Sequence, residues 1–195
     1  MRNKGIALHL LAIGVFVKIK TMNKYLKQMK KILAVLIVLT LSGCKSMMEN
    51  QTISKENINV KLDSWHKAAA DANYENYFAM MTNDAIFIGT DATENWNKTD
   101  FQAFAKPFFD KGKVWSFTAI ERHIYFDETG ETAWFDELLN TQMKICRGSG
   151  VLVKIGKEWK IKHYVLSMTI PNDNTNEVVK IKTPIEEALL KKMHK

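Results

Sequence analysis

Apolar residues recur every three or four positions in the stretch that follows residue 57. This spacing runs through residues 57–72 and predicts an amphipathic helix. A second, short helix is predicted over 74–81, with Asn73 as its N-cap. The apolar run at 85–89 predicts a buried strand between this helix and the next.

Local end signals predict two further helices. Thr99-x-x-Gln102 has the form of a capping box, and the phenylalanines that follow it lie on one face of a third helix. Pro107 should kink or end that helix, because proline lacks the backbone N–H that a helix interior uses. In the tail, residues 173–195, the Thr-Pro pair at 183–184 predicts the start of a short capped helix.

From residue 114 onward the pattern becomes that of strands. Two hairpins are predicted, the first from 114–126 and 131–143, the second from 146–155 and 158–170. Three helices with one short strand, followed by four long antiparallel strands, indicate an α+β domain with its helices on one face of the sheet.

The first 43 residues have the pattern of an export signal. A lysine-rich stretch precedes ten uncharged residues at 32–41, a run too short for a bilayer-spanning helix of about 20 residues. It ends in LSGC at 41–44, which resembles the lipobox of bacterial lipoproteins. The resemblance implies that Cys44 carries lipid, that 44–56 is a tether, and that the protein is anchored to a membrane of the cell envelope, facing the periplasm or the exterior.

Two internal methionines leave the start of the chain open. Met22 and Met29 each begin a shorter signal peptide. The apolar stretch at 6–17 is then either a second hydrophobic segment or untranslated sequence included by a misplaced start, and we favour the misplaced start.

Removal of the leader changes the charge and the cysteine count. Residues 1–43 hold eight of the 28 basic residues and none of the 21 acidic ones, so the remaining chain has a net charge of −1 rather than +7. No basic surface is left to indicate nucleic-acid binding. With Cys44 lipidated, Cys146 has no partner within the chain, which excludes a structural disulfide.

Several separated blocks resemble SnoaL-like proteins of the nuclear transport factor 2-like superfamily, over residues 57–172. The blocks are GTDATENW (89–96), the Phe-rich helix (101–109), KGKVW (111–115), AWFDELL (133–139), CRGSGVLVK (146–154) and EWKIKHYVLSMTIPN (158–172). The resemblance implies a cone-shaped, strongly curved sheet, wrapped by the helices around one apolar pocket, and frequently a homodimer. It does not choose an activity, because ketosteroid isomerase-like enzymes, dehydratases, hydrolases and non-catalytic binding domains share this fold.

Such a pocket would be lined by aromatic side chains with a few polar groups. The candidates for its walls are Trp65, Tyr77, Phe87, Trp96, Phe104, Trp115, Trp134 and Phe135. Any single one of them could equally fill the core. At the expected mouth, Asp91 and Glu94 could contact a ligand or cap the third helix.

Asp136 and Glu137 are the first candidates for proton transfer. Both interrupt an apolar strand, and neighbouring strand residues point to opposite faces, so one of them should face the pocket. A carboxylate there would act as a general acid or base, or would form a structural ion pair with Arg147.

Arg147 and His163 complete the candidates. With Lys154 taken as outward, alternation points Arg147 inward, where it would bind an acidic group of a ligand or neutralise the carboxylate. Alternation likewise places His163 on the face of Trp159 and Ile161, as a proton shuttle or a core residue. No metal or cofactor motif occurs in the sequence: the five histidines are dispersed, and no HxH, HExxH or CxxC is present.

Three functions follow as hypotheses. The first is a membrane-tethered module that binds a small apolar or amphipathic molecule. The second is an enzyme that uses an acid–base pair in the same pocket. The third is a structural lipoprotein that dimerises through its sheet.

Overall fold

The computed structural model describes residues 28–31 and 52–193. The chain divides into two units, Met1–Thr52 and Ile53–Lys195. In the first unit, residues 28–31 form a helical turn with exposed side chains. The predictions for Cys44 and for the cleaved leader lie outside the described residues, apart from that turn.

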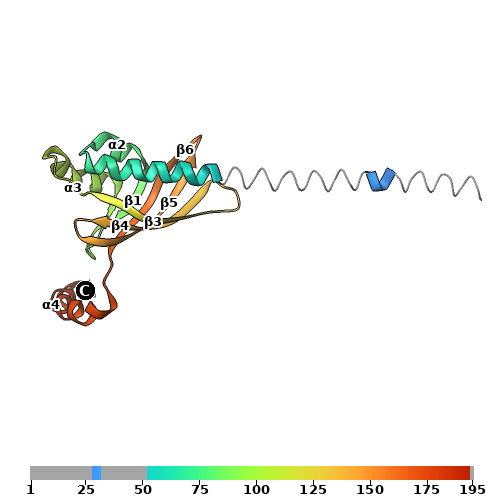
Figure 1. Cartoon of the computed structure of the whole chain (residues 1–195). Helices are drawn as coiled ribbons and strands as arrows, with labels where there is room; N and C mark the ends of the chain where they lie inside the picture. Colours follow the sequence, from blue (N-terminus) through green and yellow to red (C-terminus); the bar gives the residue numbers. More distant parts are fainter. Residues whose placement is uncertain (1–27, 32–51, 194–195) are drawn as a thin grey trace, which may run out of the picture. The chain divides into compact units, whose positions relative to one another are not determined.

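Three helices precede most of the sheet, as predicted. The first spans residues 52–70, α2 spans Tyr74–Ala79, and α3 spans Lys98–Asp110. All three lie along one face of the sheet (Figure 1). None of the helices in the described ranges combines the length and the apolar content that a bilayer-spanning helix needs.

The helix over 52–70 buries the stripe that its spacing predicts. Ile58, Leu62, Trp65 and Ala69 are each 0% exposed. Because burying a large apolar side chain stabilises a fold by about 1.5–3 kcal/mol, this stripe holds the helix on the sheet. The helix starts five residues before the predicted position, so residues 52–56, assigned above to the tether, are helical.

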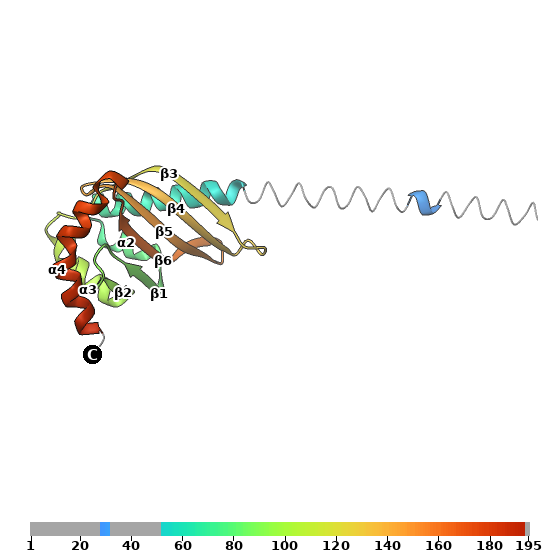
Figure 2. The ribbon, with the colours of Figure 1, turned by 90° about the horizontal axis from the view of Figure 1, so that it is seen from below.

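Within residues 52–193, six strands form one sheet. They are β1 (Met81–Ile88), β2 (Asn95–Asn97), β3 (Phe117–Phe126), β4 (Thr132–Thr141), β5 (Lys144–Ile155) and β6 (Glu158–Met168). The spatial order is β2-β1-β6-β5-β4-β3, which Figure 2 shows from below. The sheet is curved and does not close, since β2 and β3 are both edge strands.

Both predicted hairpins are present, and the prediction of an α+β fold with a curved sheet is confirmed. One pairing differs from the antiparallel expectation. β1 runs parallel to β6, with Ile86 opposite His163, so the sheet is mixed. Every other neighbouring pair is antiparallel.

The ends of two helices differ from their predictions. Asn97, not Thr99, is the N-cap of α3, and its side chain accepts from the backbone N–H of Asp100 at 2.9 Å. Pro107 lies inside α3 and does not end it. In the tail, a short 3-10 turn (Asn172–Asn174) leads into α4 (Thr175–Met193), which starts eight residues before the predicted cap at Thr183.

The sheet has an inner face, which packs against the helix over 52–70, α2 and α3, and an outer face. β4 alternates regularly: Ala133, Phe135, Glu137, Leu139 and Thr141 are buried on the inner face. β6 does not alternate regularly. Its pairing with β5 skips Lys162, so Ile161 and Tyr164 both lie on the inner face although three positions separate them.

Candidate functional site

β4 sends Glu137 to the inner face and Asp136 to the outer face, which settles the choice that alternation left open. Glu137 is 1% exposed, whereas Asp136 is on the solvent side next to His123, with Nδ1 and Oδ1 3.2 Å apart. Asp136 is therefore not in the interior. It belongs to a surface pair whose proximity raises the pKa of His123.

Glu137 lies at the centre of a buried polar cluster, defined here as Glu137, His66, Arg122 and Tyr164. The carboxylate Oε1 accepts from His66 Nε2 at 2.9 Å and from the Tyr164 hydroxyl at 2.9 Å. Its Oε2 accepts from Arg122 Nε at 2.8 Å. Side chains from the first helix, β3 and β6 thus converge on one carboxylate of β4.

Arg122 has further partners at the rim of the cluster. Its side chain is 5% exposed, and Nη2 lies 2.9 Å from Asp63 Oδ1. Nη1 donates to the backbone oxygen of Asn59 at 3.3 Å and to its Oδ1 at 3.2 Å. Because a guanidinium cannot lose its proton in a protein, these contacts are what permit its burial.

The cluster keeps Glu137 ionised. Burial alone would raise the pKa of Glu137, but the hydrogen bonds and charge interactions with His66 and Arg122 outweigh it and lower the pKa. Burial and the adjacent Glu137 charge raise the pKa of Tyr164 well above its ordinary value, so Tyr164 stays a neutral donor. A carboxylate with a lowered pKa and three donors is a weak base.

Gly148 makes room for this arrangement. A Cβ at this position would lie 2.2 Å from the Tyr164 hydroxyl and 2.9 Å from Glu137 Cγ. The glycine therefore permits a close approach of the β5 backbone to Glu137 and Tyr164.

The predicted orientation of Arg147 is wrong. Cys146, Gly148 and Leu152 are buried on the inner face of β5, whereas Arg147 is exposed on the outer face. The error arose because Lys154 was assumed to point outward. Lys154 alternates with the inward residues of β5, but it lies near the end of the strand, where its side chain reaches Glu131 and solvent. Arg122 takes the place that was predicted for the arginine.

The predicted orientation of His163 is also wrong. Trp159 and Ile161 are buried on the inner face, but the bulge at Lys162 reverses the alternation. His163 therefore points to the outer face and Tyr164 takes the inner position. A one-residue insertion has this effect because the side-chain period of a strand is two.

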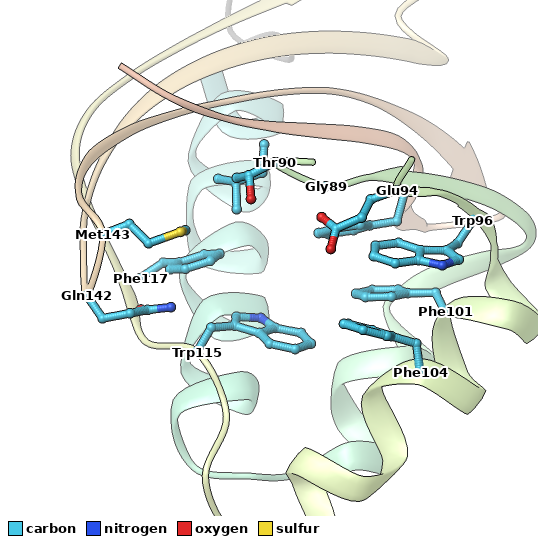
Figure 3. A pocket seen from close by; sticks show the side chains of 12 residues that line it. Gly89, Thr90, Glu94, Trp96, Phe101, Phe104, Trp115, Phe117, Gln142 and Met143 are labelled. Atoms are coloured by element: carbon cyan, nitrogen blue, oxygen red, sulfur yellow. The ribbon is translucent and has the colours of Figure 1, made fainter. Parts of the chain in front are cut away.

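A pocket opens beside α3, at the end of the sheet where β3 begins (Figure 3). Its empty volume is about 430 Å³, and part of this space is open to solvent. Its lining comprises Phe87, Gly89, Thr90, Glu94, Trp96, Phe101, Phe104, Trp115, Phe117, Gln142, Met143 and Leu166.

Four of the predicted wall residues line this pocket: Phe87, Trp96, Phe104 and Trp115. The aromatic rings beside α3 are nearly parallel, with Trp96 and Phe101 inclined by 16° and Phe101 and Trp115 by 18°. They form the right and lower walls in Figure 3.

The other predicted wall residues lie elsewhere. Trp65 and Tyr77 stack on each other in the core at 4.9 Å, and Phe135 is buried beside Tyr164 at 6.0 Å. Trp134 is 46% exposed on the outer face and stacks on Tyr125, so its prediction as a pocket residue is wrong.

The pocket and the buried polar cluster are neighbours but share no residue. Phe87 lines the pocket and stacks on Tyr164 with ring centroids 5.6 Å apart. Phe117 lines it and lies 5.8 Å from the His66 ring. These two phenylalanines stand between a molecule in the pocket and the cluster.

The candidates from the sequence missed most polar groups of both sites. The sequence pattern marks His66 only as one of five dispersed histidines and does not mark Arg122 as a site residue. His66 does follow Leu62 by four positions, which places it next to the buried stripe. No signal in the sequence pairs His66 with Glu137, because 71 positions separate them, whereas Arg122 and Glu137 lie on the two strands of one predicted hairpin.

Among residues 28–31 and 52–193, no group of three or more His, Cys, Asp and Glu side chains is arranged to hold a metal ion.

Comparison with known proteins gives one family and many structural relatives. A family model described as a SnoaL-like domain matches residues 58–171. A search of curated protein sequences finds no match.

Solved structures share the fold at low sequence identity. One is an NTF2-like protein of unknown function from Pseudomonas putida KT2440, 14% identical, covering 63% of this chain and 92% of its own, with a TM-score of 0.54. Another is a candidate scytalone dehydratase from Novosphingobium aromaticivorans DSM 12444, 11% identical, covering 63% of this chain and 89% of its own, with a TM-score of 0.53. At these identities the likeness establishes the fold and no activity.

Proposed function

Because the chain belongs to the SnoaL-like domain family, we propose that it is a membrane-tethered module that binds a small apolar or amphipathic molecule. The pocket beside α3 carries the proposal. It combines apolar walls with three polar side chains, those of Thr90, Glu94 and Gln142, which is the usual composition of a small-ligand site.

The buried polar cluster favours binding over catalysis. A catalytic carboxylate must reach the bound molecule, and neither Glu137 nor its three partners line the pocket. Glu137 also has an arginine partner, as expected of a structural ion pair. The enzyme hypothesis would need a different acid–base pair, and the likeness to a candidate scytalone dehydratase, at 11% identity, does not supply one.

The binding proposal is tested with a neutral aromatic compound and one blocking substitution. In isothermal titration calorimetry, 2-(2-naphthyl)ethanol should bind the wild-type chain. Met143→Trp should weaken this binding at least tenfold, because the larger side chain fills the pocket. Ile145→Trp is the matched control, since Ile145 is 49% exposed and outside the lining. Equal affinity of both variants and the wild type would refute the proposal.

The tether is the second part of the proposal and rests on the sequence pattern that ends at Cys44. Expressed in a bacterium, the wild-type chain should sediment with membranes and carry lipid on Cys44 by mass spectrometry. Cys44→Ser should accumulate as an unprocessed precursor or in the soluble fraction. A native chain with an intact N-terminus would contradict lipidation.

A further inference from the structure

We propose that the pocket selects molecules that carry a positively charged amine, with Glu94 as the residue that binds it. This inference rests on the binding function proposed above and names the chemical class of the ligand. The carboxylate of Glu94 projects into the pocket from the upper right in Figure 3.

The loop between β1 and β2 fixes this carboxylate in place. Gly89 N–H donates to the backbone oxygen of Glu94 at 3.0 Å, and Glu94 N–H donates to that of Asp91 at 3.0 Å. Asp91 N–H donates to Glu94 Oε2 at 3.2 Å. Thr93 in turn donates to the Asp91 carboxylate through both its N–H and its hydroxyl group. The loop is therefore held by its own bonds without a ligand.

Gly89 is the position that lets Glu94 turn toward the pocket. A Cβ on residue 89 would lie 2.1 Å from Glu94 Oε2, which no side chain tolerates. Any other residue here would displace the carboxylate.

Glu94 lacks a cationic partner within residues 28–31 and 52–193. No Lys, Arg or His side chain of these ranges forms an ion pair with it, and the hydrogen bond that its carboxylate accepts engages Oε2 alone. A ligand that covers the pocket removes water from this carboxylate, which is costly unless the ligand supplies a charge or donors in return. An ammonium group does both, through charge-assisted hydrogen bonds.

Gln142 adds a requirement at the other side of the pocket. Its Oε1 accepts from the Ser116 N–H at 3.4 Å, and its Nε2 points into the pocket opposite Glu94 (Figure 3). The ligand that fits both groups is an amine with an apolar body and a hydrogen-bond acceptor at its far end.

The test compares two compounds that differ only in the charged group. The probes are 2-(2-naphthyl)ethylamine and 2-(2-naphthyl)ethanol, titrated by calorimetry at pH 7 into the full-length chain in detergent. The proteins are the wild type, Glu94→Gln and Glu128→Gln. The glutamine at 94 keeps an oxygen that can accept from Asp91 N–H and removes only the charge. Glu128→Gln is the matched control, since Glu128 is exposed in the distant β3–β4 turn.

The wild type and Glu128→Gln should bind the amine at least tenfold more tightly than the alcohol. Glu94→Gln should abolish this preference, so that the amine and the alcohol bind with about equal affinity, because the variant loses the charge that attracts the amine. Equal binding of amine and alcohol by the wild type would overturn the inference but leave the binding function intact. A preference that survives Glu94→Gln would also overturn it. Failure of both compounds to bind the wild type would refute the binding function itself.

Discussion

Glu137 is an ionised side chain that is 1% exposed, and side chains from three other elements compensate its charge. A buried ion pair contributes little compared with a well-packed apolar pair, but loss of one partner leaves an uncompensated charge. The charge balance of the cluster is therefore needed for a stable fold. Substitutions in the cluster should accordingly change the free energy of unfolding.

Removal of either partner of the Arg122–Glu137 pair should destabilise strongly. We expect Arg122→Met and Glu137→Met each to lower the free energy of unfolding by about 3–5 kcal/mol. The double variant should lose about 1–3 kcal/mol less than the sum of the two single losses, because it leaves neither charge alone. Urea unfolding of the four proteins measures this coupling.

Arg147→Met is the control for that cycle. Arg147 is exposed on the outer face, so its loss should change stability by no more than about 0.5 kcal/mol. Strict additivity of Arg122→Met with Glu137→Met would refute the ion pair, as would a coupling of Glu137 to Arg147 instead.

The dependence of stability on pH, measured at acidic pH, should also show the contribution of Glu137. Its pKa is lowered in the folded state, from an ordinary value of about 4.5. The stability that this group supplies is therefore fully present above that ordinary value and is lost as the pH falls through the folded-state pKa. In thermal melts from pH 7 to pH 2.5, the difference between the wild type and Glu137→Gln should be constant above about pH 5 and shrink below it. A difference independent of pH would contradict a lowered pKa.

At the scale of elements, the alternation of β6 shows what a sequence pattern can and cannot predict. The existence of β6, its hairpin with β5 and its inward Trp159 follow from apolar alternation. The bulge at Lys162 does not, because it depends on pairing with two neighbours rather than on the residues of the strand itself. The inward assignment of His163, which follows the bulge, was wrong for this reason.

In the helices, too, some features could be predicted from the sequence and others could not. Apolar stripes and the N-cap at Asn73 were predictable, since both are local signals. The α3 cap at Asn97 was missed because two suitable capping residues lie close together and β2 determines which is used. The sequence predicted that aromatic side chains line the pocket. It did not predict which of these rings lie in the pocket, which in the core and which on the surface.

Deletion of single residues tests the role of the bulge. Deletion of Lys162 should give a regular strand in which Ile161 and Tyr164 both still point inward, at a cost limited to its contact with Asp84. Deletion of Lys160 should prevent folding, because it reverses Trp159 relative to Ile161. Circular dichroism and melting temperature compare the two. Equal damage by both deletions would show that the bulge does not set the faces of β6.

At the scale of the whole molecule, the outer face of the sheet carries exposed aromatic rings. Tyr125 and Trp134 are each 46% exposed and stack with centroids 5.9 Å apart, and Val151 is the β5 residue opposite Trp134. Contiguous exposed apolar groups mark interaction surfaces, and most soluble oligomers are built from copies of one chain. We propose that the chain forms a homodimer through this face.

Trp134→Glu should convert such a dimer to a monomer. In a symmetric interface the substitution would bury one glutamate from each subunit, and neither carboxylate would have an oppositely charged partner. These unpaired charges would destabilise the dimer. Analytical ultracentrifugation of the wild type and the variant measures the change. The same measurement on Ile120→Glu, a substitution of an exposed residue of β3, maps the extent of the interface. A wild-type chain that is monomeric at about 100 μM would contradict the proposal.

The parallel pairing of β1 with β6 has a consequence for the time course of folding. Met81 pairs with Ile161, 80 positions later, whereas the hairpins of β3 to β6 close over short turns. Hairpin contacts form early and distant ones wait for loop closure. Ribosomes add about 5–20 residues per second, so β1 precedes its partner by roughly 4–16 s during synthesis. Until β6 is made, the sheet that covers the apolar stripe of the first helix is incomplete, because β1 has no partner that joins it to β3, β4 and β5. The nascent chain is therefore most exposed to aggregation, and most in need of a chaperone, during this interval.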